Sequence, residues 1–261
     1  MLAEYPHFVR LARRLQWDAD AFELTADARA WPRIEPGLRA RLLGLVAGFC
    51  LGEARVAAEL EPFAARAGDA DMLACFHAQR RDEARHARFF DRVAAEVVRV
   101  PADTAPDRCA ALRPVLGERY LELFERRLPA VADDLGRGQT SLPEAVGVYH
   151  MVLEGVVFTA GLTVLLELLA QDPPALPGLR HGAELVLRDE RWHVGFGTRA
   201  LSDAGLRGAA AARVLSEGEA AADVWADIAG EEIIARTLTV HRRRLATVGI
   251  HPAGAGMQAV G

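Results

Sequence analysis

The chain has 261 residues, of which 51% are hydrophobic and 26% charged, and its formal net charge is −5. This composition excludes a disordered or fibrous chain, and the slightly acidic balance gives no reason to expect a nucleic acid partner. Every one of the 31 basic residues is arginine, which excludes Schiff-base chemistry on a lysine and a phosphate-loop lysine. Because the composition does not change sharply along the chain, we expect one domain over residues 1–261.

The cysteines and the apolar runs indicate the cellular compartment in which the protein is expected. Cys50, Cys75 and Cys109 match no zinc or redox spacing and indicate free thiols in a reducing compartment. The first twenty residues lack the apolar middle of a secretory signal, and the longest apolar run, Gly155 to Leu166, is too short to span a bilayer. We therefore expect a cytoplasmic protein with no membrane span.

The hydrophobic pattern predicts long helices and no strands. In chain order, the segments with a 3.6-residue period are 37–67, 69–98, 108–135, 141–171, 176–204 and 207–246. Helix-stopping residues cluster between them at 65–71, 100–107, 135–144 and 171–178, and Pro129 should kink or divide the third segment. Long helices with short connections and one extra helix between the second and fourth predict an all-α antiparallel bundle with a crossover.

Four of these helices carry acidic or imidazole side chains in the middle of their apolar stripes. The segments 69–98 and 176–204 each contain Arg-Asp-Glu, two residues, and then His, whereas 37–67 and 141–171 each carry one Glu on the stripe. The six polar residues on these stripes are Glu53, Glu83, His86, Glu154, Glu190 and His193. The pattern predicts four carboxylates and two imidazoles in one core.

Such a core requires compensating positive charge. A buried carboxylate without a partner costs several kcal/mol, and the stripes carry no basic residue. Two divalent ions would balance four glutamates, and a Glu and a His three residues apart on a helix can reach the same ion. This is the ligand inventory of ferritin-like di-iron carboxylate bundles, so we expect a ferritin-like four-helix core with additional helices and a metal-binding region at about 37–205.

The repeated motif is specific. Chance would give about 0.6 Glu-x-x-His matches in this composition, but only about 0.04 matches preceded by Asp, and the chain has two. The alternative is that these are ordinary exposed charges on helices whose apolar face is misplaced. Asp82 and Asp189 could bind the outer ring nitrogens, Asp82 that of His193 and Asp189 that of His86. A surface salt bridge with Arg85 or Arg191 is the alternative for each aspartate.

The motifs together resemble the ribonucleotide-reductase-like ligand-binding oxidases, relatives of the radical-generating small subunit of ribonucleotide reductase. The resemblance rests on "RLQWDADAFEL", the "GE" at 52–53, "DEARHARFF", "LFERRLPAVADDL", "AVGVYHMVLEGV" and "RDERWHVGFG", and it covers about residues 11–205. The glutamate spacings agree with that superfamily: 30 residues from Glu53 to Glu83, 71 to Glu154 and 36 to Glu190.

The resemblance implies specific roles. The reductase subunit carries its radical tyrosine seven residues after the first Glu of the pair, where this chain has Phe90, and the chain ends in "HPAGAGMQAVG" without the subunit's tyrosine-bearing tail. The ligand-binding oxidases carry a Mn/Fe pair, a long-chain fatty acid, and an ether cross-link between a tyrosine and a valine. Tyr149 matches the tyrosine, and we expect it to be catalytic, but Arg55 stands where the valine is expected and Val56 follows it.

Tyr149 and its neighbours leave alternatives open. Five residues separate Tyr149 from Glu154, and an ideal helix would turn them about 140° apart, so a π-bulge is needed to bring them together. A core tyrosine bonded to the backbone is the alternative. His150 is either a seventh ligand or a packed histidine, and the second is favoured. Trp31 could join Asp189 and His86 in an electron path as in the reductase subunit, with an ordinary buried tryptophan as the alternative.

The resemblance thus predicts an O₂-activating oxidase with two metal ions, Mn/Fe or Fe/Fe, that oxidises a C–H or O–H bond. The expected apolar pocket, suited to a fatty-acid-like molecule, is lined by Phe49, Phe90, Val157 and Phe158. Alternatives are a ribonucleotide reductase radical subunit, an N-oxygenase of a biosynthetic pathway, and a metal-storage protein. Affinity order favours Fe, so Mn would depend on geometry or supply. The relatives imply a homodimer.

Overall fold

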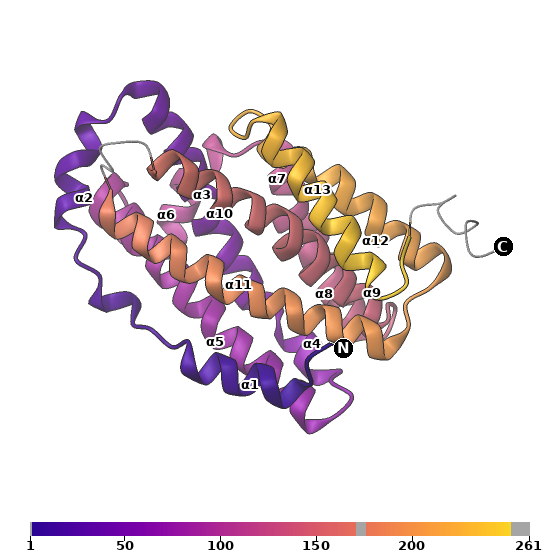
Figure 1. Cartoon of the computed structure of the whole chain (residues 1–261). Helices are drawn as coiled ribbons and strands as arrows, with labels where there is room; N and C mark the ends of the chain where they lie inside the picture. The colour runs from indigo at the N-terminus through magenta and orange to yellow at the C-terminus, as the bar shows by residue number, and fades with distance from the viewer. Residues whose placement is uncertain (1, 171–175, 252–261) are drawn as a thin grey trace.

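The computed structural model describes residues 2–170 and 176–251 and contains helices and no strand within those ranges (Figure 1). The all-α prediction is confirmed. The longest helices form the bundle that surrounds the centre of the molecule: α3 (Pro36–Glu59), α5 (Ala70–Arg92), the π-helix η6 (Gly147–Phe158) continued by α10 (Thr159–Leu169), and α11 (Pro177–Ala204). These are four of the six predicted segments.

Local sequence signals account for where these helices begin and end. Pro36 occupies the first turn of α3, and the Glu35 side chain accepts from the backbone N–H groups of Gly37 and Leu38 at 2.8 and 2.7 Å. Asp69 caps α5 by accepting from the Met72 N–H at 2.8 Å. α11 ends at Gly205, whose φ of 67° is the left-handed conformation that glycine adopts without strain.

The remaining elements surround the bundle, and they are described in chain order. Before α3 come α1 (Tyr5–Arg14), η1 (Ala19–Ala21), α2 (Thr25–Ala30) and η2 (Trp31–Arg33). Between α3 and α5 lies α4 (Glu61–Ala65), and the π-helix η3 (Val93–Val98) extends α5. The crossover contains α6 (Ala105–Leu112), η4 (Arg113–Val115), α7 (Glu118–Leu121), the π-helix η5 (Glu122–Arg127), α8 (Leu128–Arg137) and α9 (Leu142–Val146). The chain continues after α11 with α12 (Gly208–Ala221), η7 (Ala222–Trp225) and α13 (Glu231–Ala246).

Three segments differ from the prediction. The stretch 207–246, predicted as one helix, is divided at 222–230 into α12 and α13, which pack on each other and on η6 and α10. The first 35 residues, for which the pattern predicted no helix, form α1 and α2, and α1 packs along α5 and α11 (Figure 1). Pro129 lies in the first turn of α8, but the backbone stays helical from α7 through η5 into α8, so Pro129 does not divide the third segment as predicted. That segment, predicted as one helix over 108–135, is instead interrupted at 113–117, between α6 and α7. Most of the predicted break at 171–178 lies outside the described residues.

The stretch Leu142–Leu169 needs separate mention because it is long and apolar. Among the described residues it is the one helix that could cross a membrane by length and composition, with a mean hydropathy of 1.9. However, 78% of its most apolar window is buried against the rest of the protein. This burial is typical of a core helix.

Candidate metal centre

The six polar side chains predicted from the stripes meet at the centre of the bundle. They come from α3 (Glu53), α5 (Glu83 and His86), η6 (Glu154) and α11 (Glu190 and His193), and none is more than 1% exposed. The Nδ1 atom of His86 lies 3.5 Å from Glu53, 3.6 Å from Glu83 and 3.5 Å from Glu190. The Nδ1 atom of His193 lies 3.1 Å from Glu83, 3.8 Å from Glu154 and 3.5 Å from Glu190.

These contacts divide the ligand atoms into two groups. Within each group one atom from every residue lies within 4.8 Å of the others: Glu53, Glu83, His86 and Glu190 form one group, and Glu83, Glu154 and His193 form the second. Glu83 belongs to both. Two ions held this way would share a carboxylate, which is the arrangement of a dinuclear site.

Hydrogen-bond satisfaction supports metal binding as the purpose of the cluster. Buried polar atoms are almost always hydrogen-bonded in native proteins. Among the described residues thirteen buried side-chain atoms have no partner, and nine of them belong to the six residues: both carboxylate oxygens of Glu53 and Glu190, one oxygen each of Glu83 and Glu154, Nδ1 of His86 and both ring nitrogens of His193. The donor set, carboxylate oxygens and imidazole nitrogens, suits iron and manganese.

The pKa values of the glutamates and histidines indicate how protons offset the buried negative charge when no metal is bound. Burial raises the pKa of Glu53 and Glu154 well above the usual value. Burial would also raise the pKa of Glu83, but the facing His193 and His86 hold it well below the usual range. Conversely, burial would lower the pKa of both histidines, but the carboxylates that face them, among them Asp189 for His86 and Glu83 for His193, raise it well above its usual value. Protons thus occupy the positions that cations would take.

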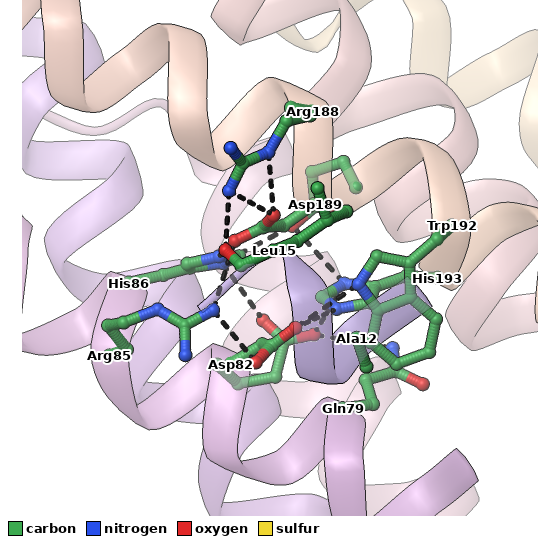
Figure 2. Close-up of polar contacts among 12 residues, drawn as sticks. Ala12, Leu15, Gln79, Asp82, Arg85, His86, Arg188, Asp189, Trp192 and His193 are labelled. Atoms are coloured by element: carbon green, nitrogen blue, oxygen red, sulfur yellow. Dashed lines mark hydrogen bonds and ion pairs between the residues drawn. The ribbon is translucent and has the colours of Figure 1, made fainter. Parts of the chain in front are cut away.

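Two aspartates lie behind the histidines on the side away from the glutamates. Asp189 lies 3.4 Å from Nε2 of His86, and Asp82 lies 3.6 Å from Nε2 of His193, so each aspartate faces the histidine of the other helix. The guanidinium of Arg85 lies between the two aspartates, 2.8 Å from Asp82 and 3.0 Å from Asp189 (Figure 2). The histidine contact and the predicted alternative, a salt bridge with Arg85, are therefore both present.

Each aspartate also accepts a hydrogen bond from an indole N–H. Trp17, from the segment before α2, donates to Asp189 at 2.7 Å, and its ring stacks on His86 with centroids 6.0 Å apart. Trp192 donates to Asp82 at 3.1 Å (Figure 2). The tryptophan predicted at this place, Trp31, is buried but makes no such bond, so the residue that touches Asp189 and His86 is Trp17.

The phenol of Tyr149 reaches the glutamates because η6 is a π-helix. The wider turn of a π-helix brings Tyr149 and Glu154 to the same side, as the prediction required. The hydroxyl donates to Oε1 of Glu83 at 3.2 Å, and burial, together with the charge of Glu83, raises the phenol pKa well above 10. The alternative, a hydroxyl hydrogen-bonded to a backbone group, is wrong, because the hydroxyl of Tyr149 contacts the side chains of Gln79 and Glu83. His150 lies beside it, and burial lowers its pKa to about 3, which keeps the ring neutral.

The position predicted for a cross-linking valine lies apart from this cluster. Arg55 is exposed on the surface of α3, whereas Glu53 two residues earlier is fully buried. Val56, the next residue, is buried. A side chain at position 55 therefore points toward solvent and not toward the buried phenol of Tyr149.

The four residues predicted to line a pocket are fully buried. Phe49 stacks on Phe90 with ring centroids 4.8 Å apart and contacts Phe158 at 5.6 Å. Trp225 of η7 covers Phe49 and donates its indole N–H to the carbonyl of Val157 at 2.8 Å. These side chains pack on one another as a closed aromatic cluster beside the glutamates.

Two contacts of the site were not predicted from the sequence. Gln79 lies one helical turn before Glu83 on the same face of α5 and is fully buried among Glu83, Tyr149 and Glu154. The hydrophobic stripe places this glutamine on the same buried face as Glu83 and His86, which is the signal that identifies it. Trp17 lies in a segment without helical periodicity, so the sequence marks it only as part of the motif "RLQWDADAFEL".

No protein-family model matches the chain. Three similar solved structures are single-residue variants of R2-like ligand-binding oxidases. One has an aerobically reconstituted Mn/Fe cofactor (21% identity, TM-score 0.68, 95% of this chain and 82% of that chain). Another has an aerobically reconstituted Fe/Fe cofactor (21%, 0.68, 95% and 81%), and a third an anaerobically reconstituted Mn/Fe cofactor (22%, 0.68, 95% and 81%). The chain therefore has the fold of the R2-like ligand-binding oxidases, as the resemblance in its motifs implied.

Proposed function

We propose that the chain belongs with the R2-like ligand-binding oxidases and is an O₂-activating oxidoreductase that holds two metal ions, Mn/Fe or Fe/Fe. The observation that carries the proposal is the set of buried, unpaired ligand atoms on Glu53, Glu190 and His193, which only cations or protons can satisfy. The solved relatives carry Mn/Fe or Fe/Fe cofactors, which agrees with this donor set.

The residues present fit two ions. Glu53, His86 and Glu190 would hold one ion, Glu154 and His193 the other, and Glu83 would contribute to both. Two divalent ions supply four positive charges against four glutamates, so the buried cluster becomes neutral. Asp189 and Asp82 would fix the ring orientation of the two histidines and increase their basicity.

When bound, the metal pair would supply the redox chemistry that reduces O₂ and oxidises a C–H or O–H bond. The chain's own residues would position the reaction and exclude water. Tyr149 places an oxidisable O–H bond 3.2 Å from a metal-binding carboxylate, and we propose it as the catalytic side chain. The closed cluster around Phe49 and Phe158 keeps bulk water from this side of the site.

We further propose that the second reactant is a small apolar molecule such as a long-chain fatty acid. It would bind against Phe49, Phe90, Val157 and Phe158, whose side chains offer an apolar wall beside the glutamates. Because these rings pack on one another, binding requires some of them to move, and Trp225, which covers Phe49, is the side chain to displace. Mass spectrometry of small molecules that copurify with the chain tests this assignment directly.

Anaerobic loading with Fe(II), alone or with Mn(II), followed by metal analysis and O₂ uptake, tests the oxidase function. We expect two metal ions per chain and O₂ consumption that depends on both. Less than about one ion per chain after loading would refute the dinuclear site, whereas two ions without O₂ uptake would leave a metal-binding protein and refute the oxidase.

A further inference from the structure

Gln79 is the one uncharged amide at the centre of the candidate metal site. It is fully buried, and its Nε2 atom lies 3.2 Å from Oε1 of Glu83, 3.3 Å from the hydroxyl of Tyr149 and within hydrogen-bond distance of Oε1 of Glu154. On the opposite side of the amide, its Oε1 atom lies 3.0 Å from Nε2 of His150. Three oxygens thus surround one end of the amide and a ring nitrogen faces the other end.

This environment determines which way the amide points. One end of the amide lies within hydrogen-bond distance of three oxygens and the other faces a single ring nitrogen, so the end that faces Glu83 and Glu154 is assigned as the NH₂ group, which donates to all three. The amide oxygen then faces His150, whose Nε2 atom must carry the ring proton in order to donate to it. A close approach of helices makes room for this ring, because a Cβ at Gly197 of α11 would lie 2.3 Å from Cβ of His150.

The amide in turn restricts the hydroxyl of Tyr149. This hydroxyl lies 3.3 Å from Nε2 of Gln79 and 3.2 Å from Oε1 of Glu83, and Glu154 is a further polar neighbour that helps to raise its pKa. An amide nitrogen donates and cannot accept, so the hydroxyl accepts from Gln79, and it donates its own proton to Oε1 of Glu83. The proton of the phenol is thereby directed at the carboxylate that belongs to both ligand groups.

We propose that Gln79, held by His150, is a positioning residue that donates to the hydroxyl of Tyr149, so that this hydroxyl accepts from Gln79 while it donates to Glu83. Glu154, whose Oε1 accepts from the same amide, is restrained by it and keeps Oε2 free for an ion. The importance of this orientation for catalysis rests on the proposed function. The orientation itself is a property of the chain and can be measured without metal.

The test uses ultraviolet resonance Raman spectroscopy on the metal-free, full-length chain. The chain has three tyrosines, so the difference between the wild-type spectrum and that of Tyr149→Phe isolates the tyrosine doublet of Tyr149. The intensity ratio of this doublet distinguishes a phenol that donates from one that accepts. Gln79→Met keeps the length of the side chain and removes its donors, and Gln79→Leu repeats the test with a different shape. Gln139→Met, at an exposed position, is the matched control.

We expect the doublet ratio to shift toward that of a donor-only phenol in both Gln79 variants and to stay unchanged in the control. His150→Leu should shift it in the same direction, and should add nothing in the Gln79→Met background, because His150 acts through the amide. An unchanged ratio, or a shift toward an acceptor-only phenol, would overturn the proposal. Metal loading of the same variants separates the two hypotheses: a wild-type chain that binds no metal refutes the proposed function, while the Raman result still decides the orientation.

Discussion

Glu53→Gln separates the cost of burying this side chain from its role in binding metal. Because burial raises the pKa of Glu53 well above the usual value, its carboxyl holds a proton in the metal-free protein, and the neutral amide has nearly the same shape and charge. We therefore expect the metal-free variant to unfold at the wild-type temperature. The loaded variant should differ, because Glu53 belongs to the His86 group only and an amide oxygen is a weak substitute for a carboxylate ligand.

The magnitude follows from linkage. An ion at 100 times its dissociation constant stabilises the native state by about 2.7 kcal/mol, which for a chain of this size raises the melting temperature by about 5–10 °C. The wild-type chain should gain this amount twice on loading and Glu53→Gln once, with one ion lost in metal analysis. Glu184→Gln, an exposed change on α11, should behave as wild type in differential scanning calorimetry with and without metal. A variant that keeps both ions and the full increment would show that Glu53 is not a ligand.

Three further predictions follow from contacts described above. Asp189→Asn should lower metal affinity by about 10–100-fold while leaving the metal-free fold intact, as measured by competition with a chelator, and unchanged affinity would contradict the role of Asp189 in orienting His86. In the metal-free protein, the pKa values of His86 and His193 are raised, so protonation of these rings stabilises the fold fully below the ordinary histidine pKa of about 6.5. This stability should be lost as the pH rises through the pKa values of the folded state. A urea midpoint that rises with pH over that range would contradict the raised pKa values. Gly155→Ala should destabilise the chain by about 1–3 kcal/mol in urea denaturation. The new Cβ would lie 2.5 Å from a guanidinium nitrogen of Arg244 and 2.9 Å from the backbone oxygen of His150. A midpoint equal to that of the wild type would show that these groups can move apart.

The site residues that could be predicted are those that recur with the helical period on long helices. Glu83, His86 and Glu190 stand on stripes whose other members are apolar, so the helical repeat alone directs them to the core. Tyr149 could be placed only conditionally, because its position depends on a π-helix, and a local widening of the turn has no clear sequence signal.

What the sequence did not show are contacts between segments far apart in the chain. Trp17 reaches Asp189 across 172 positions from a stretch with no regular repeat, whereas the resemblance to the reductase subunit had led us to expect Trp31 there. Gln79 is polar but uncharged, so its burial requires no cation, and its sequence position alone does not predict its contacts with Tyr149 and Glu154. The boundary at 222–230 was missed because α12 and α13 continue the same apolar pattern on both sides of it.

The two aspartates that support the histidines are matched in their inner contacts but not in what lies behind them. Asp189 is bonded to Trp17, a partly exposed residue, whereas Asp82 is bonded to Trp192, which is sealed in the core. A reductant arriving at the protein surface therefore finds an aromatic ring at one end only. We expect an ion in the half of the centre that contains His86 to be reduced first. The two positions would then differ in their order of reduction even if both held the same metal.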